Sequence, residues 1–188
     1  VAPRTVLTAA HCLFGRDAKE MTFLQGSDVA ASSNKVFPVS GSDYPKGENG
    51  FKYVNAYPYP DDVGVIYLDS TVAPAATLHK GKPPLTVTSS QQLDFVGFGY
   101  ALTNGSLNGL GVKREVRMPL SQLTEKTYQY SVLGANTCNG DSGGPAFIGT
   151  QAMPILTGVT SYGDAACSSF GVNTRIEAYM DWLEPRLK

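Results

Sequence analysis

The sequence predicts an all-β protein that ends in one α-helix. Short apolar segments rich in β-branched and aromatic residues recur along its 188 residues, and connectors that hold many of the 20 Gly and 12 Pro separate them. This alternation is typical of short strands joined by tight turns. Strands are expected at Val6–Ala9, Met21–Leu24, Val63–Leu68, Leu85–Thr88, Phe95–Phe98, Val112–Arg117, Ile155–Thr160 and Gly171–Ile176.

The last segment has a different periodicity. Ile176, Tyr179, Met180 and Leu183 recur at the spacing of one face of an α-helix. We therefore expect a helix there, in which Trp182 is a packing anchor rather than a binding residue.

Two connectors show neither pattern. The longer, Ser27–Pro60, ends in Tyr57-Pro58-Tyr59-Pro60, which favours an extended surface segment beside a binding cleft, although an ordinary exposed loop fits equally well. The shorter, Ala73–Pro84, contains Pro, Gly and Lys without periodicity and is interpreted as a linker. His79 within it is expected to be exposed and to take no part in chemistry.

Composition limits the classes of function. The 15 basic and 16 acidic residues leave a net charge of −1, so the basic surface typical of nucleic-acid binding is not expected. Apolar residues make up 42% and charged residues 16%, as in a folded protein. No apolar run approaches membrane-spanning length, and no signal peptide is visible.

The three cysteines, Cys12, Cys138 and Cys167, form an odd set. In a secreted protein an odd count indicates a missing partner or a free thiol, and three reduced, buried thiols are the alternative. Two distant histidines without ligand spacing, and a single carboxylate in the stretch 27–34, indicate no metal site.

The stretch Gly140–Pro145 reads Gly-Asp-Ser-Gly-Gly-Pro. Its glycines expose the Ser142 hydroxyl and let backbone N–H groups point at one spot, because no Cβ blocks the approach. A serine becomes a nucleophile when a base takes its proton and donors receive the oxyanion that it creates. Taken alone, the loop fits a tight turn of ordinary turn residues equally well.

Two further residues change that balance. His11 follows an apolar segment that ends in two alanines, and Asp62 directly precedes an apolar strand. A lone histidine after a strand is more often structural, and an aspartate before a strand is commonly a turn residue. Histidine, then aspartate, then serine, however, is one known chain order of the triad of base, orienting group and nucleophile.

The chain resembles the chymotrypsin/trypsin family of serine peptidases. The resemblance rests on Thr-Ala-Ala-His-Cys around His11, Asp-Val-Gly-Val-Ile from Asp62 and Gly-Asp-Ser-Gly-Gly-Pro around Ser142, and it continues at 96–99, 160–163 and 171–176. It implies two antiparallel six-stranded β-barrels followed by a C-terminal helix. Residues 1–75 would form the first barrel, 76–175 the second, and 176–188 the helix.

The resemblance also implies a secreted endopeptidase that works through an acyl-enzyme. Ser142 would be the nucleophile, His11 the general base and Asp62 the group that orients His11. Asp62 is preferred to Asp61 because the motif places the aspartate directly before the apolar strand. The amides of Gly140 and Ser142 would form the oxyanion hole.

Specificity is expected from residues that flank the nucleophile. By the same resemblance Asn136, six residues before Ser142, lies at the floor of the pocket, and its lack of charge argues against a strong preference for basic side chains. Asp164 would weaken this expectation if it turned inward. An open, neutral pocket for large side chains is therefore expected. The resemblance assigns substrate binding to Asn136, Ser161, Tyr162, Gly163 and Gly171.

Two departures from the family concern Asp141 and Cys12. The resemblance pairs Cys138 with Cys167, whereas the partner of Cys12 would lie upstream. The resemblance implies that Asp141 pairs with the ammonium group of a new N-terminus made by proteolysis. Val1 is not expected to be that N-terminus, because it lies a few residues before His11 in the strand that leads to it. We therefore expect an incomplete first barrel, and poor expression or inactivity of these residues alone.

Expected partners are protein or peptide substrates, a protein inhibitor and an activating protease. Neither a cofactor, a metal, nucleic acid nor a membrane is expected, and the protein is expected to be a monomer. The alternative function is a catalytically silent binding protein on the same fold. An α/β-hydrolase is excluded because its histidine follows the nucleophile, whereas His11 comes first.

Overall fold

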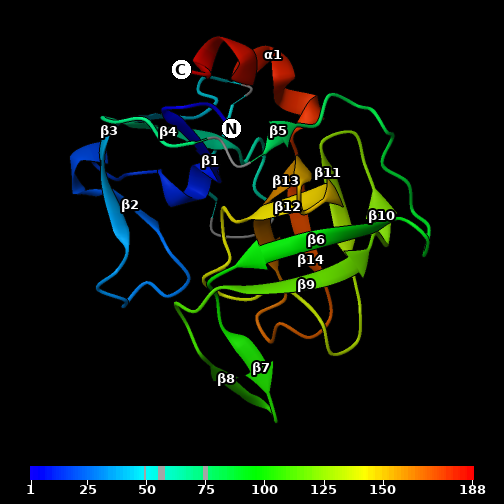
Figure 1. The fold of residues 1–188 in the computed structure, drawn as a ribbon. Coiled ribbons are helices and arrows are strands. Elements are labelled where there is room, and N and C mark those ends of the chain that lie inside the picture. The colour runs from blue at the N-terminus through cyan, green and yellow to red at the C-terminus, as the bar shows by residue number, and fades with distance from the viewer. Residues whose placement is uncertain (49, 55–57, 74–75) are drawn as a thin grey trace.

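The computed structural model describes residues 1–48, 50–54, 58–73 and 76–188. The chain forms two curled antiparallel half-barrels and a C-terminal helix (Figure 1), which confirms the expected architecture. The expected boundary between residues 75 and 76 falls partly outside the described residues. No helix in the described ranges is long and apolar enough to cross a membrane.

The first half-barrel contains four strands in the order β1-β4-β3-β2. Their bounds are β1 (Thr5–Thr8), β2 (Thr22–Gln25), β3 (Lys35–Asp43) and β4 (Gly64–Leu68). The end of β1 pairs with the start of β4, with Thr8 opposite Gly64. That register places the residues after β1 beside those before β4.

The second half-barrel contains eight strands, so the described strands number four and eight rather than six and six. Seven follow the order β10-β11-β14-β13-β12-β6-β9, and β5 pairs with β13 in parallel. A separate hairpin, β7–β8, projects from the body (Figure 1). The bounds are β5 (Thr77–Leu78), β6 (Gln92–Gly97), β7 (Ala101–Thr103), β8 (Ser106–Asn108), β9 (Arg114–Pro119), β10 (Gln122–Leu123), β11 (Thr127–Tyr130), β12 (Pro145–Thr150), β13 (Met153–Gly163) and β14 (Gly171–Arg175).

The C-terminal helical stretch confirms the expected helix. It consists of a 3-10 turn (Glu177–Tyr179), α1 (Met180–Leu183) and a second 3-10 turn (Glu184–Arg186). Two further 3-10 turns, Ala10–Cys12 and Ala18–Glu20, lie in the first half. As expected, Trp182 packs against the buried core.

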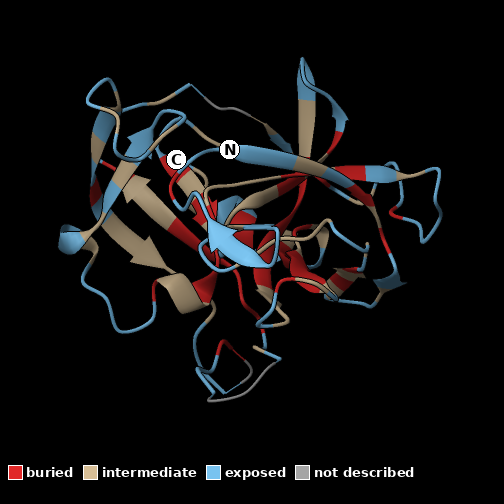
Figure 2. Cartoon of the chain, turned by 90° about the horizontal axis from the view of Figure 1, so that it is seen from below, coloured by how far each residue is buried: buried red, intermediate tan, exposed pale blue. Residues whose placement is uncertain are grey.

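The core has two parts, and buried residues fill the interior while loops form the exposed periphery (Figure 2). One part lies within the second half-barrel, around Phe95, Met118 and Tyr128. The other combines Val65 of β4 with residues of β13 and of the C-terminal stretch, such as Leu183. The second part therefore joins both half-barrels and the helix through apolar burial.

Two strand predictions did not match the structure. Leu85–Thr88 is not a strand, because the Thr86 amide and hydroxyl bond instead to the Gln91 side chain at 2.5 and 3.2 Å. Such local side-chain bonds compete with sheet pairing. Conversely β3 lies within the expected connector Ser27–Pro60. Its Pro38 obscures the strand pattern, and pairing with β2 and β4 determines the strand.

His79 is fully buried, which corrects the expectation that it is exposed. Its Nε2 donates to the Pro83 carbonyl at 2.7 Å, and its Nδ1 lies 3.0 Å from the Glu177 carboxylate without hydrogen-bond geometry. Its backbone N–H donates to Leu156 of β13. The linker is thus packed against the second half-barrel and the C-terminal stretch. Its sequence has no periodicity, so this packing could not be predicted from it.

Candidate active site

The pairing of β1 with β4 brings His11 to Asp62. His11 lies in the 3-10 turn after β1, and Asp62 lies two residues before β4. His11 Nδ1 is 2.8 Å from Asp62 Oδ2, and the His11 backbone N–H donates to Asp62 Oδ1 at 2.8 Å. The carboxylate therefore accepts from the His11 ring and holds its backbone at the same time, which makes Nδ1 the protonated nitrogen.

Asp62 is fully buried and held from the second half-barrel. The Ser161 hydroxyl on β13 donates to Asp62 Oδ2 at 2.5 Å, and the Thr174 hydroxyl on β14 donates to the Asp62 backbone carbonyl at 2.9 Å. The Ser161 hydroxyl and the two N–H groups of His11 are thus the three donors that compensate a carboxylate removed from water. The adjacent Asp61 instead binds Lys126 and Tyr179, each at 2.7 Å.

The pKa of His11 reflects two opposing effects. Burial lowers the pKa because it penalises the imidazolium, but the hydrogen bond and charge of Asp62, with a further contribution from Cys12, raise it above the ordinary histidine range. Asp62 therefore stabilises the imidazolium form of His11. That is the form a base acquires when it takes a proton.

A glycine contact brings the Ser142 loop to the end of β1. Gly143 has φ +77°, and a Cβ there would lie 2.3 Å from the Thr8 hydroxyl oxygen, so no larger residue fits. The Gly143 N–H donates to the Thr160 carbonyl at 2.8 Å, which fastens the loop to β13. The loop thus reaches the first half-barrel just before His11.

His11 and the exposed Ser142 line one cavity of about 150 Å³. Within the described residues, no hydrogen bond joins the Ser142 hydroxyl to His11, and His11 Nε2 lies 3.6 Å from the free Cys12 sulfur. The complete lining is His11, Tyr59, Thr137, Cys138, Asn139, Ser142, Thr160, Ser161, Tyr162, Gly163, Asp164 and Ala165.

The two amides expected in the oxyanion hole leave their hydrogens available. Neither the Gly140 nor the Ser142 N–H donates a backbone hydrogen bond to another described residue. Gly140 has φ +96°, and a Cβ there would lie 3.0 Å from Gly99 Cα. Glycine is therefore required at this turn both by its backbone conformation and by its close packing.

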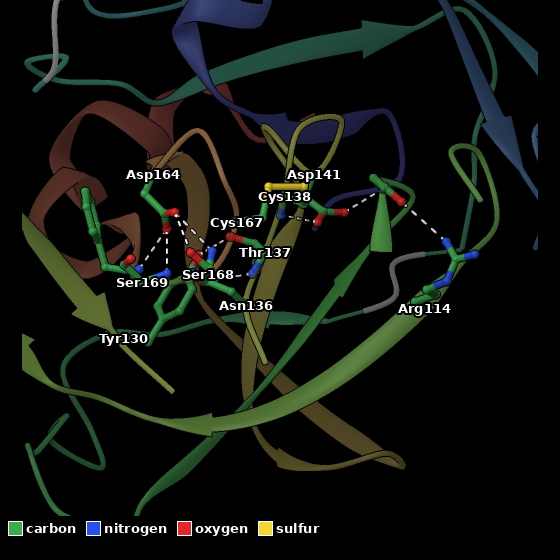
Figure 3. Close-up of a disulfide and its surroundings, with 12 residues drawn as sticks. Arg114, Tyr130, Asn136, Thr137, Cys138, Asp141, Asp164, Cys167, Ser168 and Ser169 are labelled. Atoms are coloured by element: carbon green, nitrogen blue, oxygen red, sulfur yellow. Dashed lines mark hydrogen bonds between the residues drawn. A yellow bond between two sulfur atoms is a disulfide. The ribbon is translucent and has the colours of Figure 1, made fainter. Parts of the chain in front are cut away.

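A disulfide joins the Ser142 loop to the loop after β13. Cys138 and Cys167 are bonded at 2.05 Å, which confirms the expected pair, and Figure 3 shows the bond beside Asp141 and Asp164. Cys12 is free. Because Cys138 lines the cavity and precedes Ser142 by four residues, the bond restrains one wall of the cavity.

Replacing both bonded cysteines by serine is expected to lower the free energy of unfolding by about 3–4 kcal/mol. The bond closes a loop over a sequence separation of 29, and loops of this size lose roughly that much stabilisation when opened. Urea unfolding without reductant would measure the change. The matched control Cys12→Ser breaks no disulfide, and an equal loss in that variant would contradict the explanation.

Asp164 lines the cavity, but its carboxylate is engaged by the loop that follows. Its two oxygens accept from the amides of Ser168, Ser169 and Phe170 at 2.8 to 3.0 Å (Figure 3). Burial raises the pKa of Asp164, but these hydrogen bonds outweigh it and lower the pKa to about 2. The group is therefore ionised at neutral pH, with its charge directed toward backbone amides.

Asn136 and Gly171 lie outside the lining of this cavity. Asn136 instead lines a larger cavity of about 380 Å³ that shares Thr137 and Cys138 with the first. Gly171 packs against Tyr130, since a Cβ there would lie 2.4 Å from that ring. The roles expected for Asn136 and Gly171 in substrate binding stay predictions.

Asp141 lines the larger cavity. Its Oδ1 accepts from the Gly99 N–H at 2.7 Å, and its Oδ2 accepts from the Cys138 N–H at 2.8 Å. Burial raises the pKa of Asp141, while these amides and the charge of Arg114 oppose the increase. The expected role of Asp141 as partner of an ammonium group stays a prediction.

One feature of the site was not predicted from the sequence, and one agrees with an alternative that the sequence left open. Ser161 was expected to bind substrate, but its hydroxyl also holds Asp62, and no local pattern signals that bond. Tyr59 lines the same cavity, and its ring is tilted against that of His11 with the ring centroids 5.3 Å apart, in agreement with one of the two alternatives for the stretch 57–60; Tyr57 lies outside the described residues. No group of three His, Cys, Asp or Glu side chains in the described ranges could hold a metal ion.

Comparisons with known proteins point to one family. The family model described as Trypsin matches residues 1–183. Chymotrypsin-2 from Vespa crabro is 26% identical over 201 residues, which cover 98% of this chain and 85% of that protein. Brachyurin from Leptuca pugilator is 27% identical over 200 residues, with 98% and 84% covered. Chymotrypsin from Phaedon cochleariae is 27% identical, with 98% and 69% covered.

Proposed function

This chain belongs to the trypsin family of serine proteases, and we propose that it is a secreted serine endopeptidase with His11, Asp62 and Ser142 as its catalytic triad. The observation that carries the proposal is the 2.8 Å contact between His11 Nδ1 and the buried Asp62 carboxylate, beside a cavity that Ser142 also lines. Peptide bonds are the substrates that the family implies.

In the proposed reaction, Ser142 Oγ attacks the carbonyl carbon of the scissile bond while His11 Nε2 takes its proton. His11 then returns that proton to the leaving amine, which leaves an acyl-enzyme on Ser142. Water, activated by His11 in the same way, hydrolyses the ester. The hydrogen bond between the Ser142 hydroxyl and His11 Nε2 forms when substrate is bound, since catalytic hydrogen bonds often tighten only in that complex.

The amides of Gly140 and Ser142 receive the oxyanion of each tetrahedral intermediate. Their hydrogens are not engaged by other described backbone groups, which supports this assignment. Asp141 holds their loop, and the ammonium group of a new N-terminus is its partner in the activated enzyme. The 380 Å³ cavity that Asp141 lines offers the space for that segment.

The substrate pocket is open and neutral, with Asn136, Tyr162, Gly163 and Gly171 among its residues. The engagement of the Asp164 carboxylate by backbone amides supports this proposal, because both of its oxygens already accept hydrogen bonds from the loop rather than facing the cavity unpaired. The disulfide is consistent with an extracellular location. We further propose that the protein is a monomer, that an activating protease cleaves it, and that a protein inhibitor binds it.

A panel of peptides that differ only at the residue before the scissile bond tests both the activity and the pocket. We expect hydrolysis after large neutral side chains and little after Arg or Lys, because Asp164, the one carboxylate among the described residues that line the 150 Å³ cavity, is engaged by backbone amides. Mass spectrometry of the products gives the cleaved bond, and kcat/KM ranks the peptides.

Cleavage confined to Arg and Lys would refute the neutral pocket while leaving the peptidase activity intact. If no peptide is cleaved by the activated full-length protein, and a fluorophosphonate does not react with it, the catalytically silent binding protein replaces the proposed function.

A further inference from the structure

Arg114 closes the segment that carries the β7–β8 hairpin. It begins β9, and its Nη1 donates to the backbone carbonyls of Gly109, Val112 and Gly99 at 2.6, 3.1 and 3.3 Å. Gly99 precedes β7, whereas Gly109 and Val112 follow β8. One guanidinium therefore ties together the two ends of the segment, as a planar group with several donors can.

Gly99 connects this tie to Asp141. Its carbonyl accepts from Arg114, and its N–H donates to Asp141 Oδ1 at 2.7 Å, an arrangement visible in Figure 3. A Cβ at Gly99 would lie 2.6 Å from Asp141 Cγ, and one at Gly140 would lie 3.0 Å from Gly99 Cα. The Gly99 peptide thus contacts both the carboxylate of Asp141 and the backbone of Gly140.

The charges in the 380 Å³ cavity also connect Arg114 with Asp141. Of the described residues that line it, Arg114 is the only cation, and Glu115 and Asp141 are the acids. Arg114 lowers the pKa of Asp141, against the upward effect of burial. A half-buried carboxylate whose two oxygens accept only amide hydrogens gains from a nearby positive charge.

We propose that Arg114 is a positioning residue for the oxyanion loop: it fixes Gly99, and Gly99 fixes the Asp141 carboxylate and the Gly140 backbone. Arg114 touches no reacting atom; it acts through the backbone of Gly99 and through the effect of its charge on Asp141. Its effect on catalysis rests on the proposed function, whereas its effect on the ionisation of Asp141 does not.

The first test compares Arg114→Gln with Arg117→Gln, a control on the same strand whose arginine pairs with Asp94 at an exposed site. We expect Arg114→Gln to lower kcat about 10- to 100-fold at nearly unchanged KM, as loss of a charge-assisted contact to a loop that stabilises the transition state would. Arg117→Gln should keep both constants. Equal kcat in the two variants would overturn the proposal.

The second test is the carboxyl ¹³C titration of Asp141 by NMR, which needs no activity. We expect a higher midpoint in Arg114→Gln than in the wild type, and a wild-type midpoint in Arg114→Lys, which retains the charge. A wild-type midpoint in Arg114→Gln overturns the proposal. If the wild-type protein hydrolyses no peptide, the proposed function fails, and this titration still decides the role of Arg114.

If Arg114→Gln does not fold, the same measurements are made on Arg114→Lys, which keeps the positive charge but lacks the planar guanidinium that donates to the Gly99 carbonyl. The expected result is a kcat below that of the wild type with the Asp141 midpoint unchanged. A wild-type kcat in a folded Arg114→Lys protein would show that holding Gly99 is not what Arg114 does.

Discussion

Ser142→Ala is expected to lower kcat by about 10⁶, the largest effect of any single change considered, since removal of the nucleophile from such a triad has a cost of that order. Ser142 is the proposed nucleophile, and it lines the same cavity as His11. Single-turnover hydrolysis of the best peptide would measure the loss, and labelling by a fluorophosphonate should disappear with it.

The matched control is Ser106→Ala, on the exposed strand β8. It should keep both the wild-type kcat and the labelling. The alanine at position 142 removes one exposed hydroxyl, so the midpoint of thermal unfolding should hardly change. A Ser142→Ala protein that still reacts with the fluorophosphonate would show that another residue is the nucleophile.

Asp62→Asn is expected to lower kcat by about 10⁴, the cost of this change in a serine–histidine–aspartate triad. The amide group of asparagine donates where the carboxylate accepts, so His11 would carry its proton on Nε2 and could not take one from Ser142. The change also leaves the buried Ser161 hydroxyl with a weaker acceptor.

The same substitution should move the pH profile. Neutral His11 is the proposed base, so kcat/KM is expected to rise as the pH rises through the pKa of His11 in the free enzyme. Burial lowers that pKa and Asp62 raises it, with a net upward shift. Removing the carboxylate therefore moves the acid limb of the profile to lower pH.

Asp61→Asn is the control for this second prediction. Asp61 is the adjacent carboxylate, but it binds Lys126 and Tyr179 rather than His11. The acid limb should stay at the wild-type pH in this variant. If Asp61→Asn shifted the limb and Asp62→Asn did not, the orienting carboxylate would have been assigned to the wrong residue.

Much of the fold could be predicted because most core strands carry their own signal. Val63–Leu68 was expected as a strand, and β4 spans Gly64–Leu68. The pattern failed where long-range pairing or local side-chain bonds decided the backbone. β3 is a strand despite Pro38 because it pairs on both sides, and Leu85–Thr88 is not a strand because Gln91 bonds to Thr86.

The site shows the same division. Local motifs identified His11, Asp62 and Ser142, and the structure places Asp62 rather than Asp61 against the His11 ring. Nothing in the sequence around Ser161 indicates its bond to Asp62, which joins residues 99 positions apart. The location of Asn136 in the wall of the larger cavity was equally invisible, because it depends on how the loop before Cys138 packs.

The sequence by itself determined which chemical groups are available and in what order: a histidine after β1, an aspartate before β4 and a serine in a glycine loop. These requirements are local, since glycine conformations and motif spacing are properties of contiguous residues. The tertiary structure alone decided the partners of buried polar groups, such as Ser161 for Asp62, the Leu156 carbonyl for the His79 backbone N–H, and Gly99 for Asp141. Each of these contacts is made by segments distant in sequence, because a buried charge or dipole must find compensation wherever packing brings a donor or an acceptor to it.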